Sequence, residues 1–90
     1  MNAIKVAFTA REKELIIEHT FYDPDFGGRL KEDSGNQLFI VGLTFDELED
    51  MIGYIAASAN HTDNKELEFE LDALYDRLYN LVESIDPGRL

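Results

Sequence analysis

The sequence predicts a single α+β domain over residues 1–90, in which a small, mainly antiparallel sheet packs against a C-terminal antiparallel helical hairpin. Three observations predict this fold: apolar residues alternate near the N-terminus, an apolar run follows turn-forming residues mid-chain, and two long stretches with helical periodicity come last. The expected order is β-α-β-β-α-α, with two to three strands. A chain of 90 residues is long enough for one small core.

A strand and a short helix are expected within the first nineteen residues. Apolar side chains alternate with others over residues 4–8, the period of a strand with one buried face. Residues 9–12 (Thr-Ala-Arg-Glu) form a capping box, which predicts a helix over about 10–19. Residues 22–28 (Tyr-Asp-Pro-Asp-Phe-Gly-Gly) should then form a turn, because proline disfavours a preceding helical residue and the glycine pair permits positive φ.

Residues 29–43 are expected to form a β-hairpin. Turn-forming residues at 33–36 (Asp-Ser-Gly-Asn) separate an arm at 29–32 from a second arm at 37–43. The second arm is apolar at consecutive positions, which is typical of a strand covered on both faces. We therefore place it at the centre of the sheet, beside the first strand.

Two long helices are expected in the second half of the chain. A second capping box (Thr-Phe-Asp-Glu) at 44–47, with a leucine on each side as a hydrophobic staple, opens a helix over 45–59. After a polar connector at 60–64, leucines at four- and three-residue steps predict a helix over 64–85. This helix is the longer by about 11 Å, so its last turns should run past Phe45 and pack on the sheet or on another subunit. We favour the sheet, because a lone helical hairpin buries too little apolar surface.

The ends of the connector are also predicted. Asn60 suits the C-cap of the first long helix, and Thr62 or Asp63 suits the N-cap of the second.

Negative charge is concentrated in the second half of the chain. Residues 45–90 hold twelve carboxylates and three bases, hence −9 of the total −11. A protein of this charge should be repelled by nucleic acids and anionic lipid, so we expect no direct nucleic acid binding and no membrane association. The sequence contains no cysteine, no membrane-length apolar run and no signal-peptide pattern. These features predict a cytoplasmic location.

Glu68, Asp72 and Asp76 are spaced i, i+4, i+8 and should line one edge of the last helix as an acidic ridge. Phe69 lies off the apolar stripe between two glutamates, and Arg77 has no carboxylate three or four residues away to relieve the repulsion. A solvated face that aids solubility explains the ridge. A docking face for a basic protein, with Phe69 desolvated on binding, also explains it, as does adaptation to a salty cytoplasm.

The tyrosines of the long helices allow two interpretations as well. Tyr54, Tyr75 and Tyr79 either flank the core with their hydroxyls in water or join Phe69 in an interface.

Signals for metal binding and catalysis are weak. His61 and Asp63 are candidate metal ligands, but zinc requires three or four. The segment from Asp23 resembles a calcium loop, yet its twelfth position is Ser34 where glutamate is required. There is no thiol nucleophile, nucleophile elbow or phosphate-binding loop. We therefore expect no catalytic residue, no cofactor and no enzymatic activity.

The sequence favours a non-catalytic acidic protein-interaction or regulatory module. Its expected partner is a protein, basic in charge, bound through the acidic ridge and Phe69, with homodimerisation as a further option. The first alternative is a nucleic-acid mimic that inhibits a DNA-binding protein. Three ridge charges over about 12 Å are sparse beside about seven for duplex DNA, so mimicry needs both helices or a dimer. The second alternative is a metal-binding protein that uses His61 and Asp63.

Overall fold

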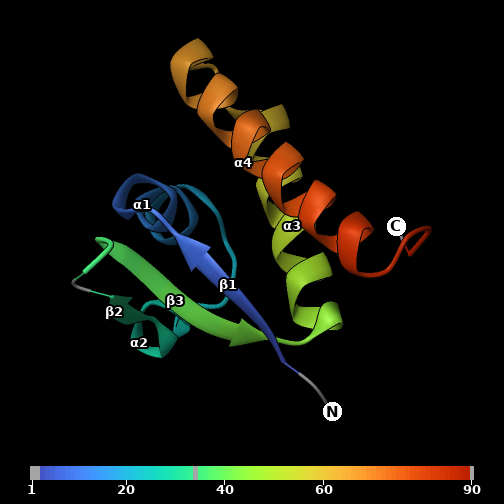
Figure 1. Cartoon of the computed structure of the whole chain (residues 1–90). Helices are drawn as coiled ribbons and strands as arrows, with labels where there is room; N and C mark the ends of the chain where they lie inside the picture. The colour runs from blue at the N-terminus through green and yellow to red at the C-terminus, as the bar shows by residue number, and fades with distance from the viewer. Residues whose placement is uncertain (1–2, 34, 90) are drawn as a thin grey trace.

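The computed structural model describes residues 3–33 and 35–89 and has the predicted α+β fold. A three-stranded antiparallel sheet packs against helices, and the last two helices form an antiparallel pair (Figure 1). The elements are β1 (Ile4–Phe8), α1 (Ala10–His19), α2 (Phe26–Arg29), β2 (Lys31–Asp33), β3 (Leu38–Leu43), α3 (Phe45–His61) and α4 (Lys65–Ile85).

The sheet has the order β1-β3-β2, so the apolar arm is central, as predicted. Its register pairs Val6 with Val41 and Lys5 with Gly42. Because side chains alternate across a strand, the two valines lie on one face, where both are buried, and the other pair lies on the opposite face, where both are exposed. We call these the inner and outer faces of the sheet.

The core lies between the inner face of the sheet and the helices. Phe8 of β1 meets Phe26 of α2 edge-on, with 5.8 Å between the ring centroids. Apolar residues from every helix complete the cluster, whose largest fully buried members are Phe8, Phe26, Leu15, Ile16, Leu43, Leu48, Met51, Ile55, Leu71, Leu74, Leu78 and Val6. Within the described ranges no polar or charged residue is buried, so the carboxylates lie at the surface.

Both predicted capping boxes are confirmed. The Glu12 amide donates to Thr9 Oγ1 over 3.1 Å, and the Thr9 amide donates to the Glu12 carboxylate over 2.9 Å. The corresponding distances between Thr44 and Glu47 are 3.1 and 3.0 Å. These reciprocal bonds satisfy amides that the first turn of a helix otherwise leaves unpaired.

The turn predicted before the hairpin is present at residues 23–26, but the expectation that the glycine pair adopts positive φ is wrong. Gly27 and Gly28 lie in the short helix α2 and do not have positive φ. Backbone bonds from Phe26 to Asp23 and from Gly28 to Asp25 wind this segment right-handed. A side chain at Gly27 would place its Cβ 3.2 Å from Ile17 Cδ1, so the partly exposed Ile17 side chain would have to shift by a few tenths of an ångström to admit it.

The hairpin and the helical connector are shifted by a few residues. The first arm begins at Lys31, because Arg29 still belongs to α2. Helix α3 continues to His61, and its C-cap is Thr62, so the expected C-cap at Asn60 is wrong. The predicted N-cap at Thr62 or Asp63 is also wrong: the Asn64 side chain accepts from the amides of residues 66 and 67 over 3.0 and 3.1 Å.

The last turn of α4 passes beyond the core, as its length requires. Val82 is buried, whereas Ile85 is 47% exposed, so close packing of this end stops before the final turn. The chain then folds back, and the Arg89 guanidinium lies 4.4 Å from the centroid of the Phe45 ring. Arg89 also forms ion pairs with Asp46 and Glu49 at the start of α3.

Candidate partner-binding site

The predicted site residues lie on α4, away from the core. Glu68 forms a 3.6 Å ion pair with Lys65, whose side chain is almost fully exposed. Asp72 and Asp76 are both exposed, and neither forms an ion pair within the described part of the chain. Among the three ridge carboxylates, therefore, Glu68 alone is paired, and an exposed ion pair of this kind is weak.

Phe69 is the most exposed of the aromatic residues on the two long helices. Its side chain is 76% exposed, although phenylalanine is usually buried. Phe69, Asp72 and Asp76 follow the i, i+3, i+7 spacing, so the ring and the two unpaired carboxylates share one helix face. This face combines a large apolar side chain with negative charge.

Two arginines fix α4 against the N-terminal part of the chain. Arg11 of α1 donates to both Glu70 oxygens over 2.6 and 2.8 Å. Arg77 of α4 donates to both Glu12 oxygens over 2.8 and 2.9 Å, and to the carbonyl oxygen of Ala7 over 2.9 Å. The prediction that Arg77 has no partner on its own helix agrees with this geometry, because its partners come from α1 and β1.

These pairs also shift the pKa of one carboxyl group. Hydrogen bonds from Arg11 hold the pKa of Glu70 below its ordinary value, because they stabilise the ionised form. A second such group lies at the start of α3, where hydrogen bonds from Arg29 and from the Thr44 amide lower the pKa of Glu47. Both carboxylates stay ionised at neutral pH, unlike a general acid, which requires a raised pKa.

A shallow hollow of about 330 Å³ follows the seam between α1 and α4. Phe69 and Ala73 line its α4 side, and Arg11, Glu12 and Arg77 line it with their paired charges. The exposed ring therefore lies beside a shallow depression whose walls include two ion pairs.

The tyrosines are mostly accounted for by packing. Tyr75 and Tyr79 are half-buried and stack with centroids 5.8 Å apart. Tyr54 meets Tyr22 edge-on at 6.0 Å. These contacts favour the core-flanking interpretation for the tyrosines and leave Phe69 as the aromatic residue of the two long helices that requires another explanation.

The histidines lie closer together than the sequence suggests. His19 ends α1, His61 ends α3, and both line one hollow of about 320 Å³ beside Phe21, which is 91% exposed. Asp63 lies in the connector after α3. Within residues 3–33 and 35–89 no three side chains from histidine, aspartate and glutamate come close enough to hold a metal ion.

The exposure of Phe21 was not foreseen, and neither was the pairing of α1 with α4. Phe21 lies after the end of α1, outside any helical or strand periodicity, so the sequence does not indicate whether its ring is buried or exposed. The arginine partners are separated by 59 and 65 residues, beyond any local spacing rule.

Comparison with known proteins gives no relative: no protein-family model, curated protein or solved structure matches this chain. Among the helices described, none combines the length and apolar character needed to cross a membrane.

Proposed function

We propose that this protein is a non-catalytic interaction module that binds a basic protein surface through Glu68, Phe69, Asp72 and Asp76. The observation that carries the proposal is the exposed Phe69 ring on the same helix face as two unpaired carboxylates. An exposed aromatic side chain gains free energy when a partner buries it, and the adjacent charges orient that partner.

The rest of the surface supports this choice of site. Arg11 pairs with Glu70 and Arg77 pairs with Glu12 on the opposite flank of α4, and the core packing of Leu71, Leu74 and Leu78 holds the helix on the domain. A preorganised helix face loses little conformational entropy on docking, which favours binding.

The distribution of charge favours a basic protein over competition with DNA. Mimicry of a duplex requires dense charge on both long helices. On α3, Glu47 pairs with Arg29, and both Asp46 and Glu49 pair with Arg89. These pairs reduce the charge of α3 and leave the α4 face as the more negative surface.

A binding titration tests the proposal. The probe is a fluorescent amphipathic peptide of lysine and leucine, titrated with the wild-type protein at about 0.15 M salt. The double variant with Asp72→Lys and Asp76→Lys should raise the Kd about tenfold, because two weak attractions become repulsions. Phe69→Ala should raise it by a similar factor through lost burial.

A matched control separates the ridge from net charge. Asp50→Lys with Asp63→Lys makes the same change of charge at two exposed positions off the ridge. The control should leave the Kd within about twofold of wild type. Equal weakening by both double variants would show that bulk charge alone attracts the peptide, and the proposed site would be wrong.

A further inference from the structure

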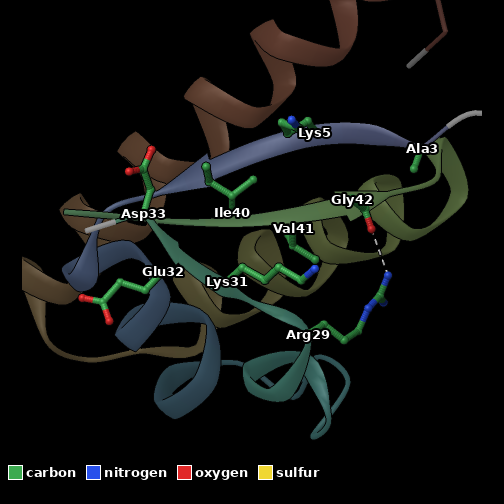
Figure 2. Close-up of a pocket in the computed structure, with 9 residues that line it drawn as sticks. All are labelled: Ala3, Lys5, Arg29, Lys31, Glu32, Asp33, Ile40, Val41 and Gly42. Carbon is green, nitrogen blue, oxygen red and sulfur yellow. Dashed lines mark hydrogen bonds between the residues drawn. The ribbon is translucent and has the colours of Figure 1, made fainter. Parts of the chain in front are cut away.

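The outer face of the sheet carries a hollow of about 680 Å³ with three basic residues around it. Lys5 comes from β1, Lys31 from β2, and Arg29 from the end of α2 (Figure 2). Its floor includes Ile40 and Gly42 of β3. In a chain of net charge −11, this local gathering of bases is unusual.

Lys5 and Lys31 differ from most other bases of the chain. Five of the eight bases form ion pairs, namely Arg11, Arg29, Lys65, Arg77 and Arg89. Lys13 lies over the Phe39 ring, 4.1 Å from its centroid. Within the described ranges Lys5 and Lys31 have no carboxylate within ion-pair distance. Both lie on the outer face, since they pair in register with Gly42 and Ile40.

Two acidic residues, Glu32 and Asp33, also line the hollow, but within the described part of the chain neither forms an ion pair with Lys5 or Lys31. Glu32 projects from the other side of β2, while the Lys31 side chain extends along β3 toward Arg29 (Figure 2). Asp33 accepts from the Gly35 amide over 3.1 Å and from the Asn36 side chain over 3.0 Å, so its carboxylate is engaged in the hairpin turn.

The spacing of the two lysines matches that of the acidic ridge. They lie two strands apart and two residues apart along the strands, which gives a Cα separation of about 12 Å. Glu68 and Asp76 are eight residues apart on a helix, which also gives about 12 Å. Ile40 lies on the strand between the two lysines and gives the hollow an apolar residue on which a ring can pack, whereas Ala3 lies close over Gly42.

We infer that the outer face of the sheet binds the acidic ridge of a second copy of this chain. Lys5 and Lys31 of one copy oppose the ridge carboxylates of the other, and Phe69 packs over Ile40. This inference rests on the proposed function of the ridge and names its basic partner.

The contact joins two different surfaces, so the copy that contributes its sheet face keeps a free ridge, and the copy that contributes its ridge keeps a free sheet face. Such a heterologous contact continues from copy to copy into a chain or a ring. Because it comprises one ring and two or three ion pairs, the contact belongs to the weak class below about 1,200 Å². The net charge of each copy opposes association at low salt, whereas about 0.15 M salt screens this repulsion beyond about 8 Å.

Sedimentation equilibrium of the full chain tests the inference. At about 0.15 M salt, the weight-average mass of the wild type should rise with concentration up to about 1 mM, and it should fall at about 1 M salt. Lys5→Glu with Lys31→Glu should raise the Kd of association at least tenfold, and so should Asp72→Lys with Asp76→Lys. An equimolar mixture of the two double variants should associate again, because their altered charges are complementary. Asp50→Lys with Asp63→Lys should associate like the wild type.

A wild type that stays monomeric at every concentration would overturn the inference. An unchanged Kd of association in the variant with Lys5→Glu and Lys31→Glu would also overturn it. The peptide titration keeps the two proposals apart. If the peptide binds the ridge while the protein stays monomeric, the ridge is a docking site for a different basic protein and the self-association is wrong. If neither occurs, the function proposed for the ridge is wrong as well.

Discussion

Replacing Phe69 by alanine should leave the stability of the fold nearly unchanged, whereas replacing Leu74 should not. About a quarter of the Phe69 side chain is hidden, roughly 50 Å², which is worth about 1.2 kcal/mol at about 25 cal/mol per Å². The alanine Cβ keeps part of that burial, and alanine gains about 0.5 kcal/mol in helix propensity. The net loss in free energy of unfolding should therefore be about 0.5 kcal/mol or less.

Leu74 lies on the other side of the same helix and is 2% exposed. Leu74→Ala removes buried methyl groups and leaves a cavity, which costs about 2–5 kcal/mol. Urea unfolding followed by circular dichroism at neutral pH measures both variants against the wild type. A loss above about 1.5 kcal/mol for Phe69→Ala would show that the ring is part of the core, and it would refute the assignment of Phe69 to a docking face.

Three further predictions concern the helix interior, acid stability and metal binding. Gly53→Ala in α3 has no atom within 4 Å of the added Cβ, so it should raise the free energy of unfolding by about 0.5–1 kcal/mol; a loss in urea unfolding would contradict the helical assignment there. The lowered pKa of Glu47 stabilises the fold above the ordinary value of about 4.3, and this stability is lost as the pH falls through the lowered pKa. Glu47→Gln should therefore be less stable than the wild type at pH 7 but equal to it at about pH 2, and a constant difference in melting temperature across this range would exclude the pairing with Arg29. Zinc ions at about 100 µM should leave the melting temperature unchanged, whereas a rise abolished by His61→Ala would establish the metal-binding alternative.

Local chemistry accounts for the features that the sequence predicted well. The capping boxes at Thr9 and Thr44 involve residues three positions apart, so their bonds follow from spacing alone. The consecutive apolar residues of β3 are likewise a signal within one short segment, and they correctly indicated that this strand is central in the sheet. Glycine was less informative, because Gly27 and Gly28 lie in a short helix and do not adopt the positive φ that glycine permits.

Features that depend on the tertiary fold were not predictable from the sequence. Arg77 meets Glu12 only because α4 passes beside α1, and Lys5 shares a hollow with Lys31 only through their common neighbour β3. The candidate site likewise has one part that local spacing predicted and one part that depends on the tertiary fold. Helical spacing correctly placed Phe69 on the exposed face of α4, but the basic surface that we infer to be its partner required the sheet register.

Residue-resolved NMR tests most directly whether the acidic ridge and Phe69 of α4 bind a basic surface. A ¹⁵N-labelled sample is titrated with the lysine–leucine peptide at about 0.15 M salt, and the backbone amide shifts are followed. The largest shifts should fall on residues 65–76, and they should disappear in the variant with Asp72→Lys and Asp76→Lys. Shifts centred on another surface, or unaltered shifts in that variant, would contradict binding through the ridge and Phe69.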